Sequence, residues 1–379
     1  MRIVHLSTLH APLDVRIFYK QCRTLAQAGH DVHLLVNNPP TPERDGVHFH
    51  ALAPTPSCIR PVRIRRRLSD ALTRALALKA DVFHFHDAEI LTIARRLKQN
   101  DATIIYDVHE DSPQEVLDMN KGRPLYAAAK YLVFKRLWST APRVVDHFVA
   151  ATPAIAAMFP PDRTTTICNY PLPEEFVDIA RARIPSRTFH PNTPPHFIFI
   201  GGISVIRGAR EMVQAMSLLP DSSNARLQLV GEFQPPELRA ELERLPGWSR
   251  VNVLPWQPRE NLAALLANSV AGLVPFHPGR NHTEALPNKI FEYMAAALPV
   301  IASDFPLWRE LISREHSGIL INPLDPKSIA DALRKIVNAP LEYAAMGQRG
   351  AQAVHSRYNW TSEGGKLVDL YKRLVPTMA

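Results

Sequence analysis

Two glutamates with seven residues between them flank a predicted helix start in the C-terminal half of the chain. Glu284 precedes the run Leu286-Pro287-Asn288-Lys289, and Glu292 follows it. Proline is favoured as the first residue of a helix because its missing N–H costs nothing there, so we expect a helix to begin at Pro287. The free N–H groups at such a helix start bind anions. The two carboxylates are suited instead to accepting hydrogen bonds from sugar hydroxyls.

A glycine-rich turn earlier in the same half could hold a phosphate. The apolar run Phe197–Ile200 leads into Gly201 and Gly202, and Arg207 and Gly208 follow shortly after. Small residues let backbone N–H groups approach an anion closely, and a basic side chain neutralises it. Most Gly-Gly turns have no binding role. The prediction of a phosphate site at this turn therefore depends on the glutamate motif in the same half of the chain.

Polar side chains end two apolar runs in the N-terminal half. His86 and Asp87 end one run, and His109 ends the next. Ligands bind beyond the carboxyl ends of strands in open α/β sheets, so we expect these residues to line a binding site. A histidine there could donate a hydrogen bond or move a proton. Metal binding is the rival interpretation of a His/Asp cluster, and we expect no metal.

Alternating strands and helices must position these residues. Short runs rich in Val, Ile and Phe suit strands buried on both faces, and amphipathic segments lie between them. This alternation occurs twice, which predicts an α/β protein with two doubly wound, Rossmann-like domains. The expected strands are Arg2–Thr8, Asp31–Val36, Val47–Ala51, Asp81–His86, Thr103–His109, His147–Ala151, Thr165–Asn169, His196–Ile200, Arg226–Val230, Val251–Leu254, Ala271–Val274, Pro299–Ser303 and Gly318–Ile321.

A proline-rich break separates the two halves. The segment 183–195 (RIPSRTFHPNTPP) carries four prolines and no periodicity, which is typical of a linker. We therefore expect an N-terminal domain over residues 1–183, a linker over 184–195 and a C-terminal domain over 196–360. The C-terminal segment 361–379 is predicted to be helical and could pack back on the first domain.

The glutamate motif resembles that of a known family. Its E-x7-E spacing, the run P-N-K-I-F-E-Y-M-A-A-A-L-P-V-I-A-S and the two-domain layout are similar to the retaining, GT-B-fold glycosyltransferases of family 4, over nearly the whole chain. The resemblance implies two domains facing each other across a cleft, with a nucleotide-diphosphate sugar on the second. It implies that Glu292 holds the ribose and that Glu284 faces the donor sugar. The base and ribose would lie near Trp256, and no cofactor is expected.

The turn departs from the family pattern. The family ordinarily has an Arg after the first glycine and a Lys six residues after that glycine, both on the diphosphate. Here Gly202 occupies the Arg position, and Arg207 occupies the Lys position. Lys289 and Arg280 are candidates for the missing cation. The resemblance further implies that His109 lies near the donor sugar and the reacting oxygen, so the expected catalytic residues are His109, Glu284 and Arg207.

The acceptor side departs from the family as well. Asp14 and Arg16 stand after the first strand, where the family usually has a glycine-rich loop. They could bind acceptor or phosphate together with His86 and Asp87, and a structural ion pair is the alternative.

The composition limits which partners the protein is expected to bind and the cellular compartment in which it is expected. A net charge of +8 suits phosphorylated ligands, nucleic acid or anionic lipid, and no nucleic-acid-binding signature is present, so we expect no nucleic acid. Three scattered cysteines and the lack of a signal-peptide layout or a transmembrane run predict a cytoplasmic protein. Two basic segments, Arg60–Arg67 and the partly aromatic Lys121–Arg143, could bind the inner face of a membrane, with a solvated face over core aromatics as the equal alternative.

The sequence therefore predicts a metal-independent glycosyltransferase that moves a sugar from a nucleotide-diphosphate donor to an acceptor hydroxyl with retention. The resemblance places it in polysaccharide or glycolipid biosynthesis, with a sugar or lipid-linked sugar as the acceptor. A nucleotide-sugar epimerase or hydrolase of the same fold, and a non-catalytic nucleotide-sugar-binding protein, are the alternatives.

Overall fold

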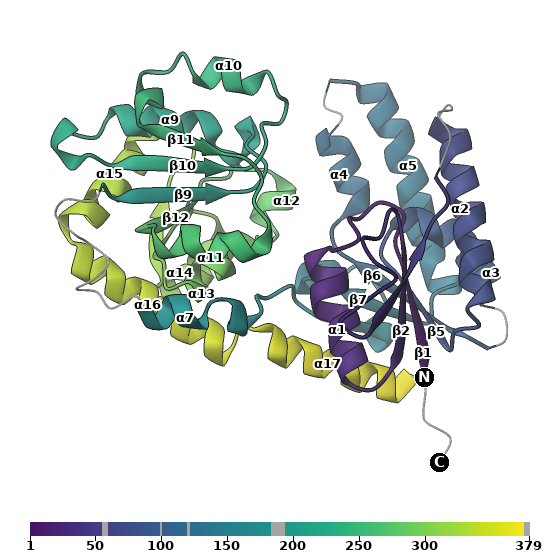
Figure 1. The fold of residues 1–379 in the computed structure, drawn as a ribbon. Coiled ribbons are helices and arrows are strands. Elements are labelled where there is room, and N and C mark those ends of the chain that lie inside the picture. Colours follow the sequence, from purple (N-terminus) through teal and green to yellow (C-terminus); the bar gives the residue numbers. More distant parts are fainter. Residues whose placement is uncertain (55–59, 99–100, 120–121, 183–193, 375–379) are drawn as a thin grey trace. The chain divides into compact units, whose positions relative to one another are not determined.

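Two sheets of almost entirely parallel strands organise the chain in the computed structural model (Figure 1). The structure describes residues 1–54, 60–98, 101–119, 122–182 and 194–374. The chain divides into two compact units. The first comprises Met1–Asn169 and Trp360–Ala379, and the second comprises Tyr170–Asn359.

The sheet of the first unit has the strand order β3-β4-β2-β1-β5-β6-β7-β8. Each neighbouring pair is parallel except β3 and β4, and β3 is an edge strand that the sequence patterns did not predict. Because β1 and β5 are central, the loops that follow them meet at one edge, as does the loop after β6. The strands are β1 (Arg2–Leu6), β2 (Asp31–Val36), β3 (Glu43–Arg44), β4 (Val47–Ala51), β5 (Val82–Phe85), β6 (Thr103–Val108), β7 (His147–Ala150) and β8 (Thr164–Thr166).

Helices of the first unit pack on this sheet and enclose a core of Val, Leu, Ile and Phe side chains. In Figure 1 the C-terminal helix α17, drawn in yellow, lies beside α1. No helix within the described residues is long and apolar enough to cross a bilayer. The helices are the π-helical η1 (Val15–Cys22), α1 (Arg23–Gln27), α2 (Arg60–Ala77), α3 (Leu91–Leu97), α4 (Ser112–Met119), α5 (Pro124–Thr140), α6 (Pro153–Ala156) and α17 (Trp360–Leu374).

The sheet of the second unit is wholly parallel, with the strand order β11-β10-β9-β12-β13-β14. The chain order reverses between β9 and β12, and ligands bind at such switch points in doubly wound folds. The strands are β9 (His196–Ile200), β10 (Arg226–Val230), β11 (Val251–Leu254), β12 (Ala271–Val274), β13 (Val300–Ser303) and β14 (Gly318–Ile321).

Helices of the second unit enclose a separate apolar core in which Trp308, Tyr293 and Phe291 are among the largest buried side chains. The helices are α7 (Val177–Ala182), the 3-10 turn η6 (Val205–Arg207), α9 (Ala209–Ser217), α10 (Leu238–Leu242), α11 (Arg259–Ala267), α12 (Arg280–Thr283), α13 (Asn288–Ala295), α14 (Pro306–Glu315), α15 (Pro326–Asn338) and α16 (Pro340–Ser356).

The units divide at a different place from the expected boundary. The segment that begins at Tyr170 belongs to the second unit, because Tyr170 packs edge-on against Phe291 at 4.8 Å and Glu175 pairs with Arg259. The periodicity of the sequence could not indicate this boundary, because the boundary depends on contacts between residues far apart in the chain. Most of the predicted linker, 183–193, lies outside the described residues.

Candidate functional site

The glycine turn after β9 is shaped by close approaches that only glycine permits. Gly208 has φ +77°, and a Cβ atom built on it would lie 2.2 Å from the carbonyl oxygen of Pro275. A Cβ atom on Gly202 would lie 2.5 Å from Oε1 of Gln234 and 2.7 Å from Nη1 of Arg207. The space beside the turn is therefore filled by polar side chains that converge on the backbone.

Two cations converge on this turn from different elements. Arg207 donates from Nη1 to the carbonyl oxygen of Gly202 at 3.1 Å. The Nζ of Lys289, on α13, lies 2.8 Å from the position that a Cβ atom of Gly201 would occupy. Both cations lie over one ring, that of Phe276, at 5.8 Å from its centroid. This arrangement fixes two positive charges beside the glycine turn, and an anion site requires such positive charge.

The positive charge of Arg207 disfavours protonation of Lys289. Burial, together with the charge of Arg207, lowers the pKa of Lys289 to about 8, although Glu292 opposes the shift. Burial also lowers the pKa of Arg207 from its ordinary value. A bound anion would relieve this repulsion, so the pair is poised to bind a negatively charged group.

Glu292 is held by a cation that the sequence analysis did not select. Nη1 of Arg259, at the start of α11, lies 3.5 Å from Oε1 of Glu292, and Arg259 also pairs with Glu175. Burial disfavours the charged guanidinium, but the two carboxylates outweigh burial and raise the pKa of Arg259. Since Glu292 and Arg207 both act on the charge of Lys289, the structure brings Arg207, Lys289 and Glu292 together.

The start of α13 corrects one detail. Pro287 was expected as the first helical residue, but its ψ of 140° is extended and it caps the helix, which begins at Asn288. Leu286 packs against the core, and the indole of Trp308 donates to the carbonyl oxygen of Ala285 at 2.6 Å, which anchors this loop. Glu284 is exposed in the same loop.

Trp256 and Arg280 were also predicted to be candidates for contact with the donor. Trp256 is 67% exposed in the segment after β11, at the edge of the sheet, where an aromatic face is open to a ligand. The side chain of Arg280 lies outside the described part of the chain, so Lys289 is the described candidate for the cation missing at Gly202.

In the first unit, one buried carboxylate organises the predicted histidines. Asp107, at the end of β6, accepts hydrogen bonds on Oδ2 from the Nε of Arg16 at 2.9 Å and from Gln21 at 2.7 Å. The same oxygen lies 2.8 Å from Nε2 of His109 and 3.2 Å from Nδ1 of His86. Asp107 therefore fixes the orientation of both imidazoles.

The protonation of this network follows from its charges. Burial would raise the pKa of Asp107, but the Arg16 guanidinium, with His109 and His86, holds that pKa well below its usual range. Burial lowers the pKa of His86 to about 4 despite the opposing effect of Asp107. His86 is thus neutral near pH 7, and Asp107 is ionised. His109 keeps 18% of its side chain exposed, which makes it the member that faces solvent.

A second imidazole–carboxylate pair lies next to the first. The Nδ1 of His10 lies 3.0 Å from Oδ1 of Asp87, and the rings of His10 and His109 are 4.9 Å apart. The other oxygen of Asp87 accepts from the backbone N–H of Thr8 at 2.6 Å and from Ser7 Oγ at 3.0 Å. Burial lowers the pKa of His10, but Asp87 outweighs burial and raises it above the ordinary value.

The structure corrects the expectation that Arg16 reaches a ligand. Arg16 is 3% exposed and makes a two-point ion pair with Asp107, and its Nη1 donates to Ile167 at 2.9 Å. Asp14 does not pair with Arg16 through its side chain but caps η1, accepting from the backbone N–H groups of Arg16 and Ile17. Both residues therefore have structural roles. His86 and Asp87 are also largely buried, but both line the same cavity as His10 and His109.

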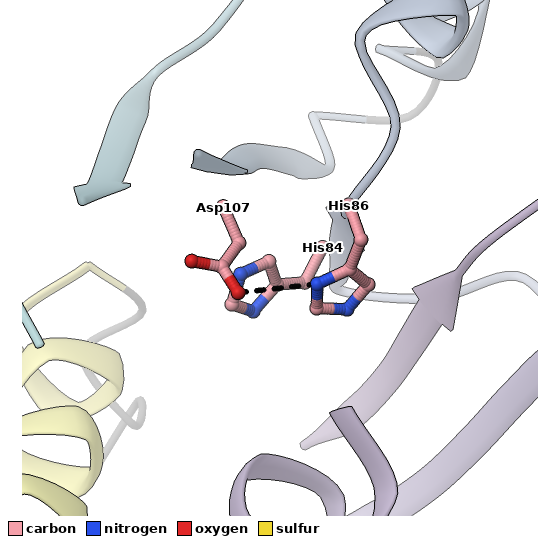
Figure 2. A group of neighbouring side chains, drawn as sticks. All are labelled: His84, His86 and Asp107. Carbon is pink, nitrogen blue, oxygen red and sulfur yellow. Dashed lines mark hydrogen bonds and ion pairs between the residues drawn. The ribbon is translucent and has the colours of Figure 1, made fainter. Parts of the chain in front are cut away.

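A metal ion is the rival occupant of the histidine cluster. Ligand atoms of His84, His86 and Asp107 lie within 4.8 Å of one another, and Figure 2 shows the contact between His86 and Asp107 with the ring of His84 beside them. Asp107, however, already carries the Arg16 guanidinium, whose positive charge opposes a cation. Nδ1 of His84 is 2.7 Å from the hydroxyl of Tyr371 on α17. These residues favour a hydrogen-bonded network over a metal site.

Several residues of both sites had not been selected from the sequence. They act through long-range contacts that spacing does not reveal, although Asp107 and Phe276 do stand at or just after strand ends, where polar and ligand-facing residues collect. These residues are His10, Gln21, Asp107, Gln234, Arg259 and Phe276.

Comparison with known proteins shows the family of the chain. The model of "Glycosyltransferase Family 4" matches residues 15–169, and that of "Glycosyl transferases group 1" matches residues 194–339. A D-inositol 3-phosphate glycosyltransferase of Xylanimonas cellulosilytica is 27% identical over 51% of this chain and 45% of its own length. An MMP alpha-(1->4)-mannosyltransferase of Mycolicibacterium hassiacum is 23% identical over 46% of this chain and 42% of its own length. The matched region spans less than half of the length of these relatives.

Solved structures resemble the whole fold. Sucrose-phosphate synthase from Thermosynechococcus elongatus has a TM-score of 0.77 at 18% identity, covering 98% of both chains. Anabaena HepE in complex with UDP-glucose has a TM-score of 0.72 at 15% identity, covering 98% of this chain and 100% of that one. WaaG, a glycosyltransferase involved in lipopolysaccharide biosynthesis, has a TM-score of 0.72 at 17% identity, covering 98% and 99%. With family models matching both halves of its sequence, the chain belongs to the glycosyltransferases of family 4 and has their two-domain GT-B fold.

Proposed function

We propose that the chain transfers a sugar from a nucleotide-diphosphate sugar to an acceptor hydroxyl. The observation that carries this proposal is the pair of cations, Arg207 and Lys289, that share the ring of Phe276 beside the Gly201–Gly202 turn. A diphosphate is the anion that such a pair suits, since each phosphate could receive one cation. HepE, a structural neighbour, was solved with UDP-glucose, which supports the choice of donor class.

The remaining donor contacts follow from the same arrangement. Glu292 would accept hydrogen bonds from the ribose hydroxyls while Arg259 holds its carboxylate, and Trp256 would offer a face to the base. Glu284 and the N–H groups at the start of α13, with Asn288, would lie toward the donor sugar. Arg207 and Lys289 would stabilise the negative charge that grows on the leaving diphosphate, which usually contributes most to such catalysis.

The stereochemistry that family membership suggests is retention. We propose a displacement on one face of the sugar ring, in which the leaving phosphate accepts the proton of the acceptor hydroxyl and His109 donates a hydrogen bond to the donor sugar. No metal ion takes part in this scheme, because two side-chain cations neutralise the diphosphate. The anomeric configuration of the product, measured by NMR before it can mutarotate, checks this step.

The acceptor is proposed to be a sugar or a lipid-linked sugar in polysaccharide or glycolipid biosynthesis. WaaG, a structural neighbour, acts in lipopolysaccharide biosynthesis, which supports this assignment. The cavity in the first unit bears on the chemistry of the acceptor.

A thermal-shift screen with UDP-, GDP- and ADP-sugars tests the donor class. At a ligand concentration of about 100 times Kd, a ligand that binds only the folded state stabilises it by about 2.7 kcal/mol. Arg207→Gln and Lys289→Gln should each abolish most of the shift, whereas Arg239→Gln, an exposed arginine of the second unit paired with Glu243, should leave it intact. The absence of a shift with every nucleotide sugar would overturn the proposal. Free sugar without transfer to an acceptor would point to hydrolysis.

A further inference from the structure

A cavity of about 1200 Å³ lies within the first unit. One wall is formed by the loops that follow β1, β5 and β6, and it includes His10, Glu89 and His109. We call this the polar wall. Another wall is formed by α2 and α5, the two helices that carry the basic segments of the sequence, and we call it the helix wall.

The charges of the polar wall are already partnered. Asp87 is saturated by His10, Ser7 and backbone N–H groups, and Glu89 accepts the hydroxyl of Thr8 at 2.6 Å. Glu110 lines the same wall and is exposed. Carboxylates and imidazoles held in this way are suited to hydrogen bonds with hydroxyl groups, as in a sugar.

The charges of the helix wall are positive. Arg63 and Arg67 on α2 and Lys130 on α5 line the cavity. Arg67 is anchored by donating from Nη1 to the carbonyl oxygen of Thr8 at 2.9 Å, and Lys130 lies 5.7 Å from the centroid of the Phe134 ring. A cluster of arginine and lysine side chains on one wall recognises phosphate.

Apolar side chains line the same wall beyond the cations. Within the cavity they are Ile64, Leu68, Val133, Phe134 and Leu137. Outside it, α5 exposes Leu125 by 88% and Leu132 by 63%, one on each side of the exposed Ala128 and Ala129, at the spacing of a single helix face. The helix α5 therefore carries apolar side chains both in the cavity and on its exposed surface.

We propose that this cavity binds a phosphate-bearing amphiphile, with its phosphate on Arg63, Arg67 and Lys130, its apolar chain along α5 and its hydroxyl-bearing group at the polar wall. Three zones of chemistry in one cavity suit one molecule that carries a chain, a phosphate and a sugar. If the proposed glycosyl transfer holds, this molecule is the acceptor, so the inference names the acceptor class. The occupant is an individual molecule rather than the surface of a bilayer, because the cationic groups line a cavity.

Calorimetric titration of the full chain without nucleotide tests the proposal with three probes. Octyl phosphate carries both a chain and a phosphate, whereas 1-octanol and inorganic phosphate each carry one of the two. We expect octyl phosphate to bind at least about tenfold more tightly than either, since only it fills two zones. Arg63→Gln and Lys130→Gln should each weaken its binding by about three- to tenfold. Arg95→Gln, an exposed arginine on α3 outside the cavity, should not.

Four results would overturn the proposal. They are equal binding of octanol and octyl phosphate, equal binding of inorganic phosphate and octyl phosphate, no effect of the Arg63 and Lys130 substitutions, and binding to phosphatidylglycerol-containing vesicles without binding of monomeric octyl phosphate. Nucleotide-sugar binding, measured on each variant, shows that the chain is folded. If octyl phosphate does not bind and the nucleotide sugar does, the acceptor class is wrong and the proposed function stands. If octyl phosphate binds and the nucleotide sugar does not, the proposed function is wrong and the assignment of the cavity stands.

Discussion

Nη1 of Arg259 lies 3.5 Å from Oε1 of Glu292, although the two residues come from different helices, α11 and α13. The same guanidinium pairs with Glu175, so Arg259 joins the segment before α7 to the carboxylate proposed to hold the ribose. Both partners are largely buried, which limits solvent screening of the pair. Arg259 is therefore placed to keep Glu292 in one orientation for the donor.

Replacing Arg259 with Gln should raise the donor KM with little change in kcat. Without the guanidinium, Glu292 is free to turn away, and the ribose loses an ordered acceptor of hydrogen bonds. We expect KM to rise by about three- to tenfold, the range of the net contribution of one hydrogen bond. Steady-state kinetics measures the split, and Arg239→Gln is the control. A fall in kcat at constant KM would show instead that Arg259 acts on the chemical step.

Gly208→Ala should strongly destabilise the second unit. The backbone there has φ +77°, and the new Cβ atom would lie 2.2 Å from the carbonyl oxygen of Pro275. The conformation and the overlap together should lower the free energy of unfolding by about 2–4 kcal/mol. Gly279→Ala is the matched control, because nothing lies within 4 Å of its Cβ position. The measurement is urea unfolding of the second unit, which is recognised as the transition that nucleotide binding shifts. Similar unfolding free energies for both variants would contradict this account of the turn.

Elements with strong local patterns could be predicted from the sequence. The expected runs Arg226–Val230, Val251–Leu254 and Ala271–Val274 are β10, β11 and β12, because continuous apolar stretches between polar turns leave little freedom in where a buried strand lies. The two-residue edge strand β3 was not predicted, because so short a segment has no periodicity. Pro287 was misplaced by one position, since both the cap and the first turn of a helix accept its φ.

The proximity of candidate site residues could be predicted where a motif names them, but not where it depends on contacts between residues far apart in the sequence. Arg207, Lys289 and Glu292 come together as the motif implies. The role of Arg16 depends instead on Asp107, 91 positions away, so no local pattern could distinguish a ligand contact from a buried ion pair. The same holds for the support of Glu292 by Arg259 and for the cavity formed by α2 and α5.

Asp107→Asn and His109→Gln should separate stability from activity in the first unit. Asn at position 107 leaves the buried Arg16 without a charged partner, which should cost about 3–5 kcal/mol of folding free energy. Gln at position 109 removes only a partly exposed ring, so stability should change by less than about 1 kcal/mol. The His109 variant should instead lose roughly a hundredfold or more in kcat if its imidazole assists transfer.

Thermal unfolding and single-turnover kinetics on both variants check this separation. Nucleotide-sugar affinity should be unchanged in the His109 variant, because the donor contacts are proposed for the second unit. A stable Asp107→Asn protein would show that Arg16 finds another partner. A fully active His109→Gln enzyme would remove His109 from the proposed mechanism.

Donor affinity should fall as the pH rises from 7 to 9. Burial and the charge of Arg207 lower the pKa of Lys289 to about 8, so the free protein loses this positive charge as the pH rises through that value. A diphosphate binds the protonated form, which means that affinity is close to its maximum at pH 7, is reduced by about half at pH 8 and declines further above it. With a pKa of about 8 in the free protein, Kd should be about tenfold higher at pH 9 than at pH 7.

Calorimetric titration with the best nucleotide sugar from the screen, at pH 7 and pH 9, measures this dependence. Lys289→Arg is the control, because a guanidinium stays charged over this range and should flatten the profile. The comparison also separates Lys289 from ionisation of the nucleotide base, which would persist in the variant. An unchanged Kd in the unsubstituted protein would mean that Lys289 does not contact the diphosphate, and the second cation would have to be sought elsewhere.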